Sequence, residues 1–329
     1  MSPMTSDFTQ TILHWFRENG RDLPWRQTRD PYAVWLSEII LQQTQVRQGW
    51  DYWERFMRRW PTVNDLAAAT EDEVLREWQG LGYYSRARNL HIAARQIVAA
   101  GSFPTTLEGI RALKGVGDYT AAAIGSIAFD LPAAVVDGNV YRVLSRYYGI
   151  STPINTTEGK HEFTALAQSL LPATHSSAYN QAIMDFGAVQ CTPQSPRCQQ
   201  CPLMESCVAF REQRVAELPV KIRKLKVQER HLTYIYIRYN GQTAIRRRPA
   251  GDIWQGLYEP WLTDDVPDGA VLLRRNVKHI LTHRILYADF YLWETAKRPQ
   301  LPDGYFWISE TEIDNYAVPR LIEILLEAL

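Results

Sequence analysis

The sequence has no excess of charge of either sign and no long apolar run. Lys plus Arg and Asp plus Glu each number 36, so the formal net charge of the 329-residue chain is zero. A neutral total removes the argument from basic composition for nucleic-acid binding, and any such contact must come from local geometry. No apolar run approaches the roughly 18 residues of a membrane-spanning helix. The N-terminus also lacks the charged-then-apolar pattern of a secretory signal, so the sequence predicts a cytoplasmic protein.

Cysteine is also scarce. The chain contains four, all in one short window: Cys191, Cys198, Cys201 and Cys207. In an intracellular protein such a cluster favours metal binding over disulfides. The spacing, with six, two and five residues between the cysteines, fits one four-thiolate site. Zinc ribbons usually contain two CxxC pairs and this window contains one, so spacing alone leaves an iron–sulfur cluster and zinc as near-equal alternatives.

Helical patterns dominate the chain before the cysteine window. Amphipathic or apolar segments separated only by turns are expected at about residues 6–19, 85–100, 158–171 and 177–190, which predicts a helical bundle. From 211 to 230 the periodicity lapses, and the segment is basic around Pro219, with Lys221, Arg223, Lys224 and Lys226. It is expected to be an interdomain linker that either touches phosphate or is simply solvated.

The periodicity changes after this linker. Residues 232–237 and 285–293 alternate between apolar and polar side chains as strands do, and residues 321–329 form an expected closing helix. The C-terminal part is therefore predicted to be a second, mixed α/β domain.

One buried acid stands out in the first region. Residues 35–46 are expected to continue a helix that has Pro31 in its first turn, apolar nearly all round and therefore buried. A carboxyl group at Glu38 either points into a cavity, where lost solvation favours the protonated form of a general acid, or is a solvated side chain on the helix face. Helix spacing alone favours neither. The neighbours expected on its face are Val34, Leu41, Gln42 and Gln45.

Two further segments carry candidate residues. The tight connection at 114–118 contains Gly115 and Gly117, which permit positive φ and leave the N–H groups of the next helix open to a phosphate oxygen. The alternative is a plain helix–turn–helix packing unit. Asp137 stands at the expected start of another helix, where capping is the default interpretation.

In this order and spacing, the segments resemble the MutY adenine DNA glycosylases of the helix-hairpin-helix superfamily over nearly the whole chain. The resemblance rests on these motifs: Leu23-Pro24-Trp25-Arg26, Trp35-Leu36-Ser37-Glu38 with Leu41-Gln42-Gln43-Thr44-Gln45-Val46, Gly80-Leu81-Gly82-Tyr83-Tyr84, Leu113 to Gly117, Val136-Asp137-Gly138-Asn139-Val140, Asn180-Gln181-Ala182 and the four cysteines.

The resemblance implies a fold and a cofactor. It implies an all-α helix-hairpin-helix region at 1–215, with a six-helix module at about 30–137 and an iron–sulfur module made of 1–29 plus 138–215. A linker at 216–230 and a smaller MutT-like (Nudix-type) α/β domain at 231–329 would follow. The cysteine spacing matches the family's four-iron, four-sulfur cluster, which favours the cluster over zinc.

The resemblance also implies a reaction. The family cleaves the N-glycosidic bond of adenine opposite 8-oxoguanine or guanine in duplex DNA, after extruding the base into a pocket. Glu38 would then protonate the adenine ring, and Asp137 would stabilise the oxocarbenium-like sugar or briefly bond to it. Supporting roles follow for the matching positions: Asn139 and Tyr119 beside the catalytic acids, Trp25, Arg26 and Gln181 in the adenine pocket, Gln43, Thr44 and Tyr83 as a wedge, and Gly115, Val116 and Gly117 at the DNA backbone.

The C-terminal domain resembles MutT without the glutamate-rich metal box, so no nucleotide hydrolysis is expected. The family's lesion-reading Phe-Ser-His corresponds here to Leu281-Thr282-His283: Thr282 keeps the hydroxyl, His283 is retained, and Leu281 loses the aromatic ring. The resemblance also implies a monomer, which would be associated with the nucleoid through its binding to DNA.

Two other functions remain alternatives. A bifunctional glycosylase and lyase of the endonuclease III type would need a lysine nucleophile where this chain has Tyr119. A non-catalytic DNA-damage binding protein would not need the Glu38–Asp137 pair.

Overall fold

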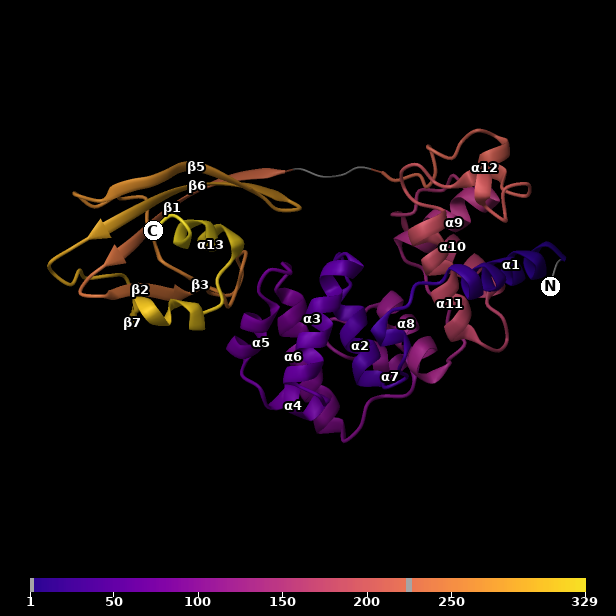
Figure 1. The fold of residues 1–329 in the computed structure, drawn as a ribbon, viewed down its shortest axis with the longest axis horizontal. Coiled ribbons are helices and arrows are strands. Elements are labelled where there is room, and N and C mark those ends of the chain that lie inside the picture. Colours follow the sequence, from indigo (N-terminus) through magenta and orange to yellow (C-terminus); the bar gives the residue numbers. More distant parts are fainter. Residues whose placement is uncertain (1–2, 223–226) are drawn as a thin grey trace. The chain divides into compact units, whose positions relative to one another are not determined.

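A computed structural model describes residues 3–222 and 227–329 (Figure 1). The predicted linker residues Arg223, Lys224 and Lys226 lie outside the described residues. Contacts divide the chain into two compact units: unit 1 is Met1–Asn64 with Ala93–Arg223, and unit 2 is Asp65–Ile92 with Lys224–Leu329. This grouping cuts across the sequence boundaries 1–215 and 231–329, which stay a prediction. Among the described residues, no helix has the length and apolar character needed to cross a bilayer.

Helices occupy the chain before the cysteine window. Their bounds are α1 (Pro3–Asn19), η1 (Pro24–Arg26), α2 (Pro31–Ile40), α3 (Val46–Arg59), α4 (Val63–Ala68), α5 (Glu71–Trp78), α6 (Ser85–Ala100), α7 (Leu107–Arg111), α8 (Asp118–Phe129), α9 (Gly138–Tyr148), α10 (Thr157–Leu170), α11 (Ser176–Asp185) and the π-helical turn η2 (Phe186–Gln190). The cysteine loop then contains η3 (Cys198–Gln200) and α12 (Val208–Arg211). The predicted all-α first region is confirmed.

Helix α2 follows the sequence expectation at its start and departs from it at its end. The Asp30 carboxylate caps it by accepting the N–H of Tyr32 at 3.1 Å, and Pro31 occupies the first turn. Every residue from Tyr32 to Ile40 is buried, as its apolar surround predicts. The expected continuation to residue 46 is wrong, because the chain turns at 41–44, where Gln43 has φ +56°, before α3 begins at Val46.

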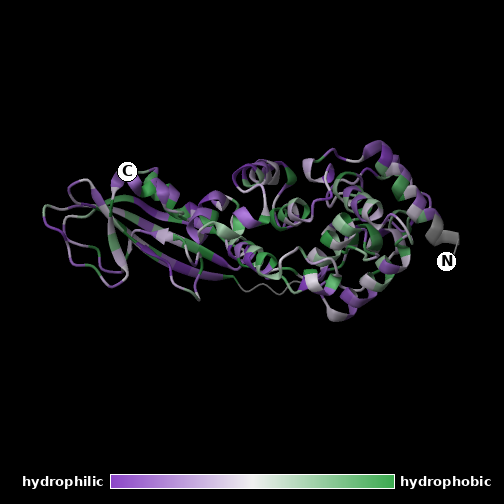
Figure 2. Cartoon of the chain, turned by 90° about the horizontal axis from the view of Figure 1, so that it is seen from below, coloured by the Kyte–Doolittle hydropathy of each residue, from purple (hydrophilic) through white to green (hydrophobic). Residues whose placement is uncertain are grey.

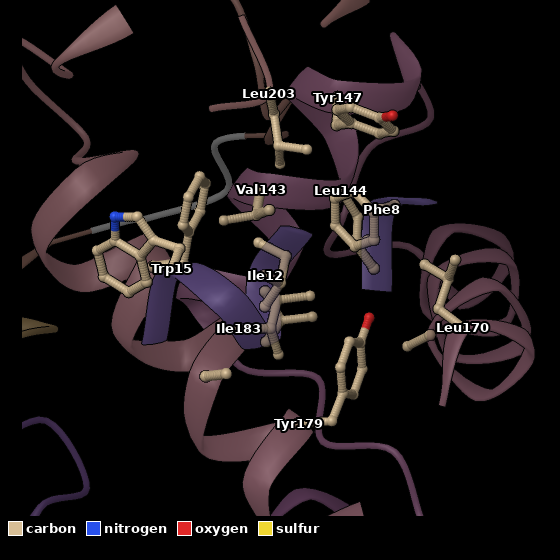
Figure 3. Close-up of a cluster of buried hydrophobic side chains, with 14 of the residues drawn as sticks. Phe8, Ile12, Trp15, Val143, Leu144, Tyr147, Leu170, Tyr179, Ile183 and Leu203 are labelled. Carbon is tan, nitrogen blue, oxygen red and sulfur yellow. The ribbon is translucent and has the colours of Figure 1, made fainter. Parts of the chain in front are cut away.

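One apolar core of unit 1 joins its N-terminal helix to helices near the C-terminal end of the unit. Helices α1, α9, α10 and α11 meet in it, so residues more than a hundred positions apart in sequence pack side by side. Figure 3 shows this cluster, with labelled side chains from α1 (Phe8, Ile12, Trp15), α9 (Val143, Leu144, Tyr147), α10 (Leu170) and α11 (Tyr179, Ile183). Burying so many large side chains fixes α9 and α11, the two helices that border the site described below.

Unit 2 contains two sheets and a closing helix. The first sheet has the strand order β4-β1-β6-β5 and the second has the order β3-β2-β7. Their bounds are β1 (Gln228–Arg238), β2 (Gln242–Arg247), β3 (Tyr258–Glu259), β4 (Trp261–Leu262), β5 (Val271–Ile280), β6 (Arg284–Glu294) and β7 (Tyr305–Ser309), followed by η4 (Glu310–Asn315) and α13 (Arg320–Leu326). Figure 2 shows hydrophilic and hydrophobic residues mixed along these strands.

The core of unit 2 lies between the sheets and α13. Leu321, Ile322 and Leu325 of α13 pack with Tyr234 of β1 and Phe290 of β6, all of them fully buried. β1 and β6 are parallel over their whole length, and β5 is antiparallel to β6 with two irregularities in its register. The hairpin loop between β5 and β6 is residues 281–283, so the predicted lesion-reading tripeptide stands at one end of the sheet.

Candidate active site

Unit 1 encloses a cavity of about 450 Å³, a size typical of small-molecule sites. Eight of the residues given a site role from the sequence line it: Trp25, Arg26, Glu38, Thr44, Tyr119, Asp137, Asn139 and Gln181. They come from η1, the end of α2 and its following turn, α8, α9 and α11, so the fold gathers them from five separate segments. Gln43 is exposed on the turn after α2 and does not belong to this lining.

Glu38 is buried in the cavity wall. Only 7% of the residue is exposed. The pKa of its carboxyl group is raised to about 7: burial is the largest cause and the Asp137 carboxylate adds to it, while a hydrogen bond from Tyr119 and the charge of Arg26 oppose the shift. A carboxyl group with this pKa is protonated in a substantial fraction of molecules at neutral pH and can donate that proton. The structure therefore favours the cavity-facing alternative over the solvated one.

Asp137 both caps α9 and faces the cavity. Its Oδ1 accepts the N–H groups of Asn139 and Val140 at 2.8 Å each, and its Oδ2 accepts the Asn139 side-chain amide at 2.8 Å. Burial raises the pKa of Asp137, while these three donors oppose that shift. The predicted capping role is confirmed. The two carboxyl groups therefore stand in different settings, with Glu38 receiving one hydrogen bond and Asp137 three.

An arginine that the sequence analysis did not identify fixes the orientation of the Asn139 side chain. Arg142 Nη2 donates to Asn139 Oδ1 at 2.7 Å, so the amide NH₂ must point to Asp137. The same guanidinium donates to the carbonyls of Gly187 at 2.6 Å and Cys191 at 2.7 Å. Gly187 lies in the π-helical turn, where a Cβ would stand 2.6 Å from the Asn139 Cβ. The missing side chain at Gly187 thus allows η2 to approach the site.

Tyr119 is the hydrogen-bond partner of Glu38. Its hydroxyl donates to Glu38 Oε2 at 3.1 Å, and burial raises the pKa of Tyr119 well above its usual value. The phenol therefore stays a neutral donor. In α8, the neighbouring Thr120 hydroxyl accepts from Gln42 at 3.1 Å, which directs Gln42 to α8 rather than along the expected helix face of Glu38.

The connection before α8 is a tight hairpin with open backbone at its glycines. Gly115 has φ +81°, and Gly117 precedes the helix as its N-cap. A Cβ built on Gly117 would meet nothing within 4 Å. Val116 between them is buried, and its N–H is bonded to the Leu113 carbonyl at 3.1 Å, so it anchors the hairpin. The start of α8 therefore presents uncovered backbone to solvent at Gly117.

The four cysteines line one small apolar cavity together with Met204, Phe210 and Val215. Burial raises the pKa of Cys201 to about 12 and also raises the pKa of Cys198 and of Cys207, so these three thiols favour the protonated form unless a cationic group lies among them. Arg146 is nearly fully buried and donates to Cys191 Sγ at 3.4 Å and to the Thr192 carbonyl at 2.7 Å. Within the described ranges, no group of three His, Cys, Asp or Glu side chains is placed to hold a metal ion, while the four cysteines share one cavity. These thiols and the guanidinium fit an anionic iron–sulfur cluster.

A second cavity, of about 700 Å³, lies within unit 2. It is bordered by residues 80–85, by 252–255 and by the β5–β6 loop, and includes the predicted residues Tyr83, Thr282 and His283. Tyr83 has φ +47°, is 47% exposed, and its hydroxyl lies 2.5 Å from Thr282 Oγ1. Arg88, Arg284 and Arg320 also border it; Arg88 donates to the Gln255 carbonyl, Arg284 pairs with Asp252, and Arg320 pairs with Glu323 and Glu327.

Three family profiles match the chain. Residues 36–172 match the HhH-GPD superfamily of base excision DNA repair proteins, residues 233–328 match the NUDIX domain, and residues 191–207 match the iron–sulfur binding domain of endonuclease III. The last match covers the four cysteines. With the hairpin and the cavity, these matches define a base-excision DNA repair glycosylase that carries an iron–sulfur cluster.

Relatives and solved structures narrow the class. A protein of Buchnera aphidicola (Schizaphis graminum) named adenine DNA glycosylase is 36% identical over 76% of this chain and 73% of its own length. The mouse adenine DNA glycosylase is 46% identical over 62% of this chain and 42% of its own length. The structure of a thermostable thymine-DNA glycosylase is similar with a TM-score of 0.59 and 32% identity, over 63% of this chain and 97% of that one. The chain therefore belongs to the adenine DNA glycosylase family.

Proposed function

We propose that this chain removes adenine from duplex DNA where it is paired with 8-oxoguanine or guanine, and that it does so by hydrolysis alone. The observation that carries the proposal is the pairing of Glu38 and Asp137 in one cavity, with the pKa of Glu38 raised to about 7. The names of the relatives indicate adenine as the nucleobase that is removed, and the cavity contains a protonatable acid and a carboxylate in different settings.

The proposed reaction divides the work between the two acids. An adenine turned out of the duplex enters the cavity, and Glu38 gives its proton to a ring nitrogen as the N-glycosidic bond breaks. The Asp137 carboxylate, held by three donors, stabilises the positive charge on the sugar until water adds to the anomeric carbon and the proton that this water loses returns to Glu38. Tyr119 and Asn139 hold these two groups in place.

A hydrolytic route fits the residues of the cavity better than a lyase route. A lyase forms a Schiff base through an amine. Within the described part of the chain, the cavity lining includes no lysine, and the expected nucleophile position is the phenol Tyr119.

Reading of the opposite base is proposed for the cavity of unit 2. Thr282, His283 and Tyr83 offer hydroxyl and imidazole groups beside three arginines, which suits the extra carbonyl oxygen of 8-oxoguanine. We propose in addition a monomer that works on nucleoid DNA, as a single chain contains both cavities.

The test is a single-turnover assay on four duplexes: 8-oxoguanine:A, G:A, T:A and an 8-oxoguanine:C control, each with and without alkali. We expect strand breaks on 8-oxoguanine:A and G:A only after alkali, because hydrolysis leaves an intact backbone with an abasic site. Breaks without alkali would show a lyase, and binding without any excision would show a damage-binding protein.

A further inference from the structure

Asp185, at the end of α11, carries an unusually large set of hydrogen bonds for a residue with no assigned part in the reaction. Its side chain is fully buried. Arg26 donates to both carboxylate oxygens at 2.8 Å, and Arg21 donates through its backbone N–H at 2.9 Å and its side-chain Nε at 2.9 Å. Arg21 Nη2 adds a further bond at 2.5 Å. One carboxylate therefore holds two guanidinium groups.

These bonds fix the segment that carries the cavity residue Arg26. Arg26 Nη1 also donates to the Arg21 carbonyl at 2.8 Å, and its guanidinium lies 5.3 Å from the centre of the Phe16 ring. Both arginines line the same cavity as Glu38. The Asp185 side chain has no place in that lining, so it can act on the cavity only through its partners.

The charges of this group reach Glu38. Although burial raises the pKa of Asp185, hydrogen bonds from Arg26 and Arg21 outweigh it, and the pKa lies below its usual value. The carboxylate is therefore charged, and the three side chains together carry one net positive charge. The charge of Arg26 in turn lowers the pKa of Glu38.

We propose that Asp185 is a positioning residue for adenine excision: it clamps Arg26 and Arg21 into the cavity wall and offsets part of the positive charge that this wall presents to Glu38. The inference rests on the proposed adenine excision. Its chemical logic is that Glu38 must keep its proton at neutral pH, and an uncompensated pair of guanidinium groups nearby would favour the ionised form.

Other titratable or charged groups also lie near Glu38. Tyr119 of α8 donates a hydrogen bond to it, and the Asp137 carboxylate at the start of α9 repels its ionised form. Arg142 of α9 also borders the cavity, but Asn139 and the carbonyls of Gly187 and Cys191 take up its guanidinium. Arg26 of η1 is thus the cation whose influence on Glu38 depends on Asp185.

The experiment measures single-turnover adenine excision against pH in the full-length protein with its iron–sulfur cluster. The alkaline limb of the profile reports loss of the Glu38 proton. Asp185→Asn leaves two guanidinium groups without the carboxylate, so we expect the limb to move to lower pH by about half a pH unit, with about threefold slower excision on the alkaline side. Asp185→Glu keeps the charge, and its limb should stay in the wild-type position even if the rate falls.

Two controls separate positioning from general damage. Asp130→Asn makes the same chemical change at the end of α8, where the carboxylate accepts bonds from Ser176 and Ser177 and the residue has φ +52°, which asparagine tolerates. The alkaline limb of the pH profile of Asp130→Asn should stay in the wild-type position. In an Arg26→Gln background, Asp185→Asn should shift the limb by less than half as much, because the partner through which it acts is missing.

The outcomes are distinct. A wild-type protein that leaves adenine in place removes the proposed function itself. Active wild-type protein with an unmoved limb in Asp185→Asn, or with the full shift retained beside Arg26→Gln, overturns the positioning role. If Asp185→Asn does not retain iron or fold, Arg21→Gln is the substitute: it lowers the net charge of the group, and its limb must move to higher pH for the inference to stand.

Discussion

Glu38 is subject to two opposing demands at the scale of a single residue. Its burial favours the protonated form that the proposed catalysis needs, while Tyr119 and Arg26 favour the ionised form. We expect Glu38→Gln to bind the duplex within a few-fold of wild type, since the side chains have the same shape. Its excision rate should fall by more than the 10²–10⁴-fold usual for a general acid, because departure of the base depends on protonation. Single-turnover rates beside a binding titration measure both quantities, and near-normal excision by the variant would contradict the role.

The same substitution has a predicted effect on stability. The pKa of Glu38 is raised from 4.5 to about 7 in the folded protein. Its contribution to stability is therefore fully present below pH 4.5 and is lost as the pH rises through 7. Glutamine has no proton to lose, so Glu38→Gln should unfold like wild type at pH 4 and be more stable at pH 8, by about 3 kcal/mol at most. Denaturant titrations at the two pH values measure the difference. Equal stabilities at both would place the Glu38 pKa near its ordinary value.

In the proposed recognition of the opposite base, Thr282 offers a single hydroxyl group. It lies 2.5 Å from the Tyr83 hydroxyl in the cavity of unit 2. One hydrogen bond contributes about 0.5–1.5 kcal/mol, so Thr282→Ala should reduce the preference for 8-oxoguanine:A over G:A by about tenfold at most. The ratio of single-turnover rates on the two duplexes measures this preference. Thr295→Ala, whose hydroxyl bonds to the Lys297 carbonyl, is the matched control. An unchanged ratio of rates in Thr282→Ala would show that Thr282 has no part in lesion recognition.

The hairpin before α8 separates folding from DNA contact at the scale of one element. Gly117→Ala adds a methyl group to open space with φ at −97°, so the free protein should unfold at the wild-type temperature while its affinity for DNA falls. Gly115→Ala forces a side chain into φ +81°, which costs about 1–2 kcal/mol. That variant should lose stability as well as affinity. Thermal unfolding and duplex titration in parallel test the contrast, and a Gly117→Ala protein with wild-type affinity would argue for a packing hairpin.

The elements with a strong period were predictable from sequence, and the others were not. The long helix at 85–100 is confirmed as α6, and the segments 232–237 and 285–293 lie within β1 and β6, because each shows a buried face at regular spacing. β5 was missed because most of its residues are exposed, including Val271 and Ile280. The expected helix at 177–190 changes to a π-helical turn at Phe186, where Gly187 lets η2 approach Asn139.

The site shows the same division. Glu38 and Asp137 were identifiable because an acid in an apolar helix and an acid at a helix start are local patterns. Asp185, Arg142 and Arg21 were not, since their importance lies in partners such as Asn139 and Arg26, which no sequence period connects to them. Only the packing of α11 and η2 beside α9 and η1 brings these groups together.

At the scale of the whole molecule, the two proposed tasks lie in separate parts of the chain. Every residue of the Glu38 cavity precedes position 194, and Thr282 belongs to the C-terminal part. Within unit 2, α5 makes polar contacts with that part, among them Arg247 with Glu71 and Asp72 and the Tyr258 hydroxyl with Asp72. Exposed ion pairs of this kind contribute little to stability, so losing these contacts should change the free energy of folding of the remaining chain little.

A chain that ends after Ile222 should therefore retain adenine excision and lose lesion preference. This end point keeps the bonds of Ile222 to Asn155 and of Val220 to Ile154, which tie the last segment to unit 1. The thermostable thymine-DNA glycosylase matches 63% of this chain with 97% of its own length, so a related helical region folds without a second domain. We expect slow excision from G:A and a preference for 8-oxoguanine:A reduced by more than the tenfold limit of Thr282→Ala, because the whole lesion-facing surface is absent. Iron content and thermal unfolding verify the fold before the rates are compared. A truncated chain that is folded, retains its cluster and yet leaves adenine in both duplexes would show that chemistry also depends on the C-terminal part.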